Sequence, residues 1–339
     1  MSFLSSRLPA CLLIASLSAV YAADTLRSAA DARGIHIGTA VASRLLQQPE
    51  YAAVLAREFN QVQPENETKM RNVHPTRDRF DFSAADAIAA FAAAHGMKMR
   101  GHVLVWHEAV PAWVSQGGFT PDQLESILRE HITTEVSHFA GRIYAWDVVN
   151  EAVEKDGSMR KSVWSGIPNY IAGAFRTAHA ADPAALLFYN DYDTEERNAK
   201  SDAVYALVQK LLQDGVPING VGFQCHLTLK GVSKADFMVN LARFTALGLQ
   251  VQITELDVRI PLENGAPKPE DLERQARVYS DVASACVATP HCTAIQTWGF
   301  TDRYSWVPHT FKGTGAALPF DADYKPKPAW TALLRALQP

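Results

Sequence analysis

The chain has 339 residues, of which 47% are hydrophobic and 20% are charged, and its formal net charge is -4. This composition is typical of a globular protein with one large domain or two small ones. The slightly acidic balance and the absence of any basic block argue against nucleic acid or an anionic membrane surface as a partner.

Residues 1–22 have the pattern of a secretory signal peptide. Arg7 is followed by a largely apolar run from Ala10 to Val20, and small residues around Ala22 offer a cleavage site. The apolar run is too short to be a good membrane anchor, and no other run approaches that length. We therefore expect residues 23–339 to be exported as a soluble protein, to the periplasm or outside the cell.

The rest of the chain alternates predicted strands and helices with a period near forty residues. Strands are predicted at 34–40, 59–62, 98–105, 143–150, 186–190, 220–224, 250–254 and 293–298. The helices with the clearest ends are predicted at 84–95 (with Ser83 as its cap), 120–139, 169–181, 201–212, 269–287 and 328–337. Eight such units and no linker predict a single α/β domain, a TIM (β/α)8 barrel, over residues 23–339.

Two glutamates lie where predicted strands end. Glu151 follows the strand at 143–150, and Glu255 follows the strand at 250–254. A buried carboxylate is costly unless it is paired or functional, and the carboxyl ends of barrel strands are where catalysis takes place. One such glutamate is easily explained as an ion-pair partner. Two of them, roughly a hundred residues apart, match the pair of catalytic carboxylates that a retaining glycosidase uses.

Polar and aromatic residues accumulate at seven of the eight strand ends. Amides, imidazoles, carboxylates and flat indoles suit a neutral sugar chain. No glycine-rich phosphate loop or dinucleotide fingerprint is present. His102, His107 and His226 lack the paired spacing of a helical zinc site, so we expect no metal and no cofactor.

Three cysteines remain after removal of the predicted signal peptide. In an oxidising compartment, Cys286 and Cys292 could close a short loop as a disulfide. Cys225 is then unpaired, and we interpret it as a small buried hydrophobic residue.

Several motifs resemble those of glycoside hydrolase family 10, the endo-β-1,4-xylanases. The most specific are Trp-Asp-Val-Val-Asn-Glu-Ala at 146–152 and Ile-Thr-Glu-Leu-Asp at 253–257. Matching segments follow in the family's order across nearly all of the mature chain, at 59–69, 100–107, 187–192, 220–226, 298–306 and 327–330.

The resemblance implies a role for each matched residue. Glu255 would be the nucleophile, and Glu151 the general acid and then the general base, with net retention. His226 would hydrogen-bond Glu255 and be held by Asp257, while Asn150 would contact the sugar 2-hydroxyl. The sugar-binding residues on the glycone side and around the cleavage point would be Glu65, Asn66, Lys69, His102, Gln224, Trp106, Trp298 and Trp306.

We therefore expect a secreted, monomeric endo-β-1,4-xylanase that acts on xylan and xylo-oligosaccharides without a cofactor. The family often pairs two cysteines before the last strand, which fits Cys286 and Cys292. Met70 stands where many relatives have tryptophan, so outer glycone packing would be softer. The alternatives are a retaining β-1,4-glucanase or other specialised glycosidase on the same barrel, and a catalytically inactive polysaccharide-binding barrel.

Overall fold

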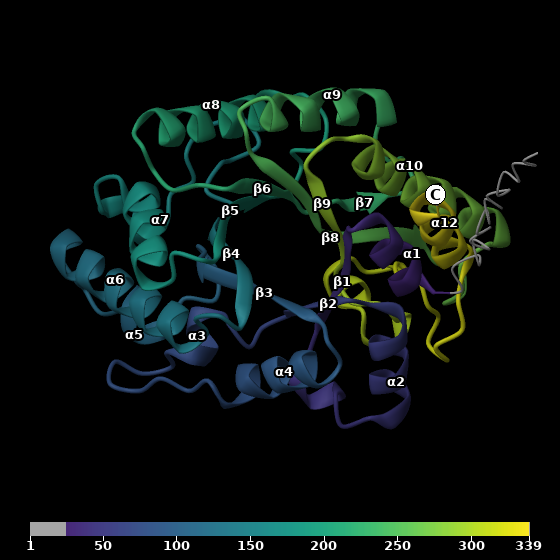
Figure 1. Ribbon diagram of the computed structural model, residues 1–339, viewed down its shortest axis with the longest axis horizontal. Helices are drawn as coiled ribbons and strands as arrows, with labels where there is room; N and C mark the ends of the chain where they lie inside the picture. The colour runs from purple at the N-terminus through teal and green to yellow at the C-terminus, as the bar shows by residue number, and fades with distance from the viewer. Residues whose placement is uncertain (1–24, 339) are drawn as a thin grey trace, which may run out of the picture.

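A computed structural model describes residues 25–338, so the predicted signal peptide lies outside the described residues. Eight parallel strands form a closed ring with the helices outside it (Figure 1). The ring closes because the last strand pairs with both its predecessor and the first strand. The strands are β1 (His36–Val41), β2 (Gln61–Pro64), β3 (Lys98–Val105), β4 (Ile143–Asn150), β5 (Leu186–Asp191), β6 (Gly220–Phe223), β8 (Gln250–Pro261) and β9 (Cys292–Thr297).

Helices follow the strands and cover the outside of the ring (Figure 1). The long ones are α1 (Leu26–Arg33), α2 (Pro49–Glu58), α4 (Ser83–Ala94), α6 (Pro121–His138), α7 (Tyr170–Ala181), α8 (Ala199–Gln213), α9 (Lys234–Thr245), α10 (Pro269–Ala288) and α12 (Pro328–Leu337). The short elements are α3 (Met70–Val73), α5 (Ala112–Ser115), α11 (Val307–Thr310), η1 (Ser43–Leu45), η2 (Val163–Gly166) and η3 (Asp302–Tyr304). This arrangement confirms the predicted TIM (β/α)8 barrel.

The predicted strand at 250–254 is longer in the structure. β8 continues to Pro261 because two short strands, β7 (His226–Thr228) and β10 (Thr314–Gly315), pair with its second half. This extension carries β8 past the carboxyl ends of the neighbouring ring strands β6 and β9.

Capping residues correctly predict the start of α6 but not that of α4. Thr120 caps α6 through a capping box, as the Thr-Pro sequence predicts. The assignment of Ser83 as a cap is wrong, since Ser83 is the first helical residue of α4 and Phe82 occupies the cap position. The Ser83 hydroxyl instead donates a 2.6 Å hydrogen bond to Asp81. The side chain that accepts hydrogen bonds at the start of this helix is therefore Asp81, two residues before Ser83.

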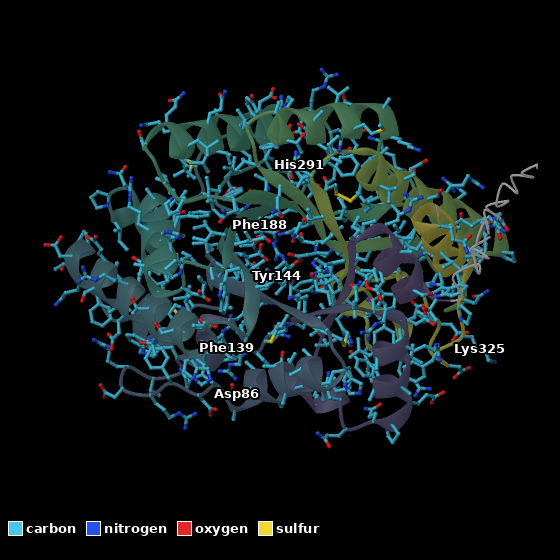
Figure 2. All side chains as sticks on the ribbon, in the orientation of Figure 1. Asp86, Phe139, Tyr144, Phe188, His291 and Lys325 are labelled. Carbon is cyan, nitrogen blue, oxygen red and sulfur yellow. A yellow bond between two sulfur atoms is a disulfide. The ribbon has the colours of Figure 1, made fainter. Side chains whose placement is uncertain are left out.

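Polar side chains fill part of the barrel interior. Gln61 donates to Gln296 at 2.7 Å, and the Tyr144 hydroxyl donates to Gln61 at 2.6 Å. Arg100 extends this network by donating to Gln252 at 3.1 Å. Figure 2 shows Tyr144 at the centre of the ring. These groups tolerate burial because they hydrogen-bond one another.

The predicted disulfide is present. Cys286 of α10 and Cys292 of β9 are joined across six residues of sequence, and Cys225 is buried with a free thiol. In the described part of the chain, no helix combines the length and apolar character that crossing a membrane requires.

Candidate active site

The end of β4 places Glu151 at the rim of the barrel. Its φ of 57° lies in the left-handed region, which is uncommon for a residue with a side chain. Two hydrogen bonds hold this turn: the Glu151 amide donates to the Asn190 carbonyl at 2.9 Å, and Arg160 Nε donates to the Glu151 carbonyl at 2.7 Å. Strained backbone held by its surroundings is typical of functional positions.

Glu255 lies on β8 with only 4% of its surface exposed. Its Oε2 accepts a hydrogen bond from His226 Nε2 at 3.0 Å, and the other ring nitrogen of His226 lies 3.0 Å from Asp257. Asp257 also accepts a 2.7 Å hydrogen bond from the Trp306 indole. The structure thus links Glu255, His226 and Asp257 in the order that the family resemblance implies.

This chain sets the charges around Glu255. Burial tends to lower the pKa of His226, but the charge and hydrogen bond of Asp257 and the contact with Glu255 raise it to about 10. Burial also tends to raise the pKa of Glu255, yet the hydrogen bond from His226 and the electrostatic effect of His102 hold it below its ordinary value. His226 is therefore protonated and Glu255 is ionised at neutral pH.

A chain of amides connects the two glutamates. Asn190 Nδ2 donates to Glu255 at 2.7 Å and to the Asn150 side-chain oxygen at 2.9 Å. Asn150 Nδ2 in turn donates to Glu151 Oε1 at 3.0 Å, and Gln224 Nε2 donates to the same oxygen at 2.9 Å. These contacts fix the relative orientation of the two carboxyl groups.

The two oxygens of Glu151 have different surroundings. Oε1 accepts from both amides, whereas Oε2 accepts, among the described residues, only from the Trp106 indole, at 2.9 Å. Oε2 therefore has the remaining capacity to carry a proton.

The orientation of His102 is fixed by a buried ion pair between Asp147 and Arg100. Asp147 binds the guanidinium of Arg100 and lies 2.9 Å from His102 Nδ1. Burial raises the pKa of Asp147, but the charge of Arg100 and the hydrogen bond from His102 outweigh it and hold the pKa below its ordinary value. The same ring nitrogen of His102 lies 4.0 Å from Glu255.

A cleft of about 630 Å³ opens over the two glutamates, within the range of roughly 300–1,000 Å³ that small-molecule sites occupy. Every predicted site residue lines it except Asp257, which lies behind His226 and Trp306. Lys69 Nζ lies 4.9 Å and 5.6 Å from the ring centroids of Trp106 and Trp298. Burial lowers the pKa of Lys69, against the opposing effect of the nearby carboxylates.

Some residues of the site have no role predicted from the sequence. Asn190 bridges Asn150 and Glu255, and its position at the end of a predicted strand was a usable signal. Arg160 donates to the Glu151 carbonyl and is itself held by a 2.9 Å hydrogen bond to the Tyr192 hydroxyl. Arg160 lies in a loop without a sequence motif, so no local signal marks it. The other lining residues without a predicted role are His107, Glu108, Lys155, Asp193, Arg259, Thr310 and Phe311.

The three rim histidines do not form a metal site together. Across residues 25–338, no group of three or more histidine, cysteine, aspartate or glutamate side chains has the geometry to hold a metal ion. His102 and His226 instead use their ring nitrogens on Asp147, Asp257 and Glu255.

A (β/α)8 barrel with two linked carboxyl groups in a tryptophan-lined cleft is the arrangement of a glycoside hydrolase. The family model described as glycosyl hydrolase family 10 matches residues 25–336. The chain is 44% identical over 333 residues to endo-1,4-beta-xylanase B of Thermotoga neapolitana, covering 96% of each protein. The chain belongs to glycosyl hydrolase family 10.

Solved structures agree with this assignment. Native xylanase 10B from Thermotoga maritima superimposes with a TM-score of 0.90 at 46% identity, covering 92% of this chain and 98% of that one. Xylanase 10B from Thermotoga petrophila RKU-1, in complex with xylobiose, gives a TM-score of 0.90 at 45% identity, covering 92% and 97%.

Proposed function

We propose that this protein is a secreted endo-β-1,4-xylanase that hydrolyses internal bonds of xylan with retention of configuration. The observation that carries the proposal is the amide-linked pair of Glu151 and Glu255 inside the tryptophan-lined cleft. Relatives named as endo-1,4-beta-xylanases and a neighbouring structure in complex with xylobiose support the choice of substrate.

In the first step, the ionised carboxylate of Glu255 attacks the anomeric carbon and forms a glycosyl ester. Glu151 gives its proton to the glycosidic oxygen, so that the bond to the departing chain breaks. Oε2 of Glu151 is the oxygen suited to this transfer, because two amides already occupy Oε1. Trp106 supports Oε2 from the protein side.

In the second step, Glu151 removes a proton from water, which attacks the anomeric carbon and releases Glu255. Formation of the ester removes the negative charge of Glu255, so Glu151 loses its proton more readily at this stage. Two inversions at one carbon give net retention.

Asn150 is proposed to stabilise the transition state through the sugar 2-hydroxyl. One hydrogen of its amide nitrogen goes to Glu151, and its oxygen accepts from Asn190 and Gln224. The second hydrogen of the nitrogen has no partner among the described residues and can point to the sugar. This contact strengthens as the oxocarbenium-like transition state forms.

Export to an oxidising compartment is part of the proposal. It rests on the signal-peptide pattern of residues 1–22 and on the disulfide between Cys286 and Cys292, since disulfides persist mainly in such compartments. N-terminal sequencing of the protein recovered outside the cytoplasm tests it, and an intact first methionine would contradict it.

Release of reducing sugar from β-1,4-xylan, carboxymethyl-cellulose and β-mannan, measured side by side, tests the substrate assignment. Strong release from xylan alone is expected. Release mainly from the glucan would keep the two-carboxylate chemistry and favour the β-1,4-glucanase alternative. No release from any of the three would favour an inactive binding barrel.

Glu151→Ala tests the acid/base role. With an aryl β-xylobioside that has an activated leaving group, the first step should proceed without an acid, while attack by water slows by about 10²–10⁴-fold. Azide needs no general base and should restore turnover, with a β-glycosyl azide as the product. Glu255→Ala is the matched control, because without the ester azide can only displace the leaving group directly, and the product is then the inverted α-glycosyl azide. Failure of azide to rescue Glu151→Ala would refute the assigned role.

A further inference from the structure

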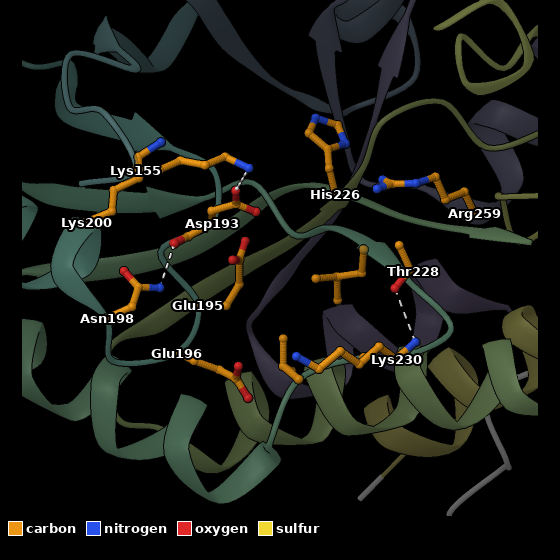
Figure 3. Close-up of a pocket in the computed structure, with 13 residues that line it drawn as sticks. Lys155, Asp193, Glu195, Glu196, Asn198, Lys200, His226, Thr228, Lys230 and Arg259 are labelled. Carbon is orange, nitrogen blue, oxygen red and sulfur yellow. Dashed lines mark hydrogen bonds and ion pairs between the residues drawn. The ribbon is translucent and has the colours of Figure 1, made fainter. Parts of the chain in front are cut away.

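A second pocket of about 420 Å³ opens beside the active-site cleft (Figure 3). The two share four lining residues, Lys155, Asp193, His226 and Arg259, so they are continuous. The remaining lining comes from the segment after β5, including Lys200 in the first turn of α8, and from β7 and the segment between it and α9. A side branch of a ligand bound in the cleft can therefore extend directly into this pocket.

The pocket lies away from the predicted glycone side. Glu65, Asn66 and Lys69 follow β2, whereas the pocket is built mainly after β5 and β6, and β6 is four strands away from β2 around the ring of eight. Because the family resemblance places the glycone beside β2, the pocket borders the part of the substrate chain on the departing, aglycone side.

The carboxylates of the pocket are already engaged. Asp193 forms a 2.9 Å ion pair with Lys155. The buried carboxylate of Glu195 accepts a 2.8 Å hydrogen bond from the Cys225 amide, and Glu196 accepts one of 2.6 Å from the Ser233 amide.

Two cationic side chains of the pocket have no carboxylate partner among the described residues. Arg259 and Lys230 form no ion pair with any carboxylate among residues 25–338. Arg259 is half-buried on β8, where its guanidinium lies 4.1 Å from the ring centroid of Phe311. Figure 3 shows Arg259 pointing toward His226 on one side of the pocket, with Lys230 on the opposite side. Guanidinium groups fixed in this way suit carboxylates, which they bind through paired hydrogen bonds.

We propose that this pocket binds a carboxylate-bearing sugar branch, a uronic acid attached to the xylan chain on the aglycone side of the cleavage point. The proposal rests on the xylanase function proposed above and specifies its substrate. Arg259 binds the carboxylate, Lys230 adds positive charge at the far side, and the rest of the pocket accommodates the sugar ring.

The test compares three substrates: linear xylo-oligosaccharides, glucuronoxylan, and the same glucuronoxylan after chemical reduction of its carboxyl groups to alcohols. The quantity compared is the ratio of kcat/KM on the charged polymer to kcat/KM on the reduced one. Because both polymers have the same branches, this ratio isolates the charge, and any general loss of active enzyme cancels.

The native protein should favour the charged polymer by about fivefold, the effect of one hydrogen-bonded charge at a partly exposed site. Arg259→Gln should bring the ratio close to one, and Lys230→Gln should reduce it by a smaller factor. Arg335→Gln is the matched control, since Arg335 is an exposed α12 arginine that forms no ion pair within the described part of the chain. That variant should keep the native ratio. Raising the salt concentration should lower the native ratio, because it screens exposed charges.

The outcomes separate the two proposals. Hydrolysis of the linear oligosaccharides with a native ratio of one would overturn the uronic-acid site and leave the xylanase function intact. A high ratio that persists in both Arg259→Gln and Lys230→Gln would also overturn it. Failure to cleave the linear oligosaccharides would overturn the xylanase function itself. If Arg259→Gln does not fold, the surface variant Lys230→Gln still decides the matter.

Discussion

Replacing His226 by alanine tests how the nucleophile is kept ionised. In the native protein, His226 lies 3.0 Å from Glu255 and lowers the pKa of that carboxyl against the opposing effect of burial. His226→Ala removes the donor and its charge, and leaves Asp257 as an uncompensated buried carboxylate nearby. Both changes raise the pKa of Glu255, so protonation should inactivate the nucleophile at a higher pH.

The size of the shift follows from the lost contact. A hydrogen bond to a charged group contributes about 1.5–3 kcal/mol, and one pKa unit corresponds to about 1.4 kcal/mol. The acidic limb of the pH profile should therefore move upward by about 1–2 pH units. His102 remains 4.0 Å from Glu255 and limits the shift.

The assay is kcat/KM against pH with an aryl β-xylobioside. The activated leaving group needs no proton from Glu151, so the acidic limb reports the ionisation of Glu255 in the free enzyme. His226→Gln is the control variant, because its amide is a neutral donor and should give a smaller shift. An acidic limb of His226→Ala at the native pH would refute the proposed control of Glu255 by His226.

Two further predictions concern stability. Burial raises the pKa of Glu135 well above its ordinary value, with His131 3.3 Å away, so the folded protein should lose stability as pH rises above the unfolded pKa of this carboxyl. Glu135→Gln should thus raise the free energy of unfolding by about 1–3 kcal/mol at pH 7 and by much less at pH 4, as urea titration can measure. An equal effect at both pH values would contradict this. Replacing Cys286 and Cys292 together by serine should lower the free energy of unfolding by about 2 kcal/mol, because the disulfide closes a loop across only six residues. Reductant should destabilise the native protein by that amount and leave the double variant unaffected.

Most strands could be located from the sequence because they are short, contain apolar residues such as Val, Ile and Leu, and are followed by polar residues. β3, β4 and α12 have the predicted bounds, since hydrophobic runs and prolines mark their ends. The lower accuracy for β8 has a physical cause. Its second half pairs with β7, which precedes it in the chain, and with β10, which comes after β9. Both partners are distant in sequence, and no local pattern in the β8 sequence indicates such pairing.

The sequence by itself determined that residues at the carboxyl ends of the strands meet in one cleft. In a closed parallel barrel, all carboxyl ends of the strands share one rim, so residues such as Glu151 and Glu255 converge although a hundred residues separate them. Their place in the cleft therefore follows from their place along the strands.

Only the tertiary structure decided how these side chains contact one another. Asn190 links the two glutamates, and Arg160 reaches back from a loop to hold the backbone of Glu151. Within residues 25–338, Arg259 has no carboxylate partner, whereas Asp193 of the same pocket is paired with Lys155. Each of these contacts depends on side-chain directions and loop paths, which are set by packing among distant segments and leave no periodic pattern in the sequence.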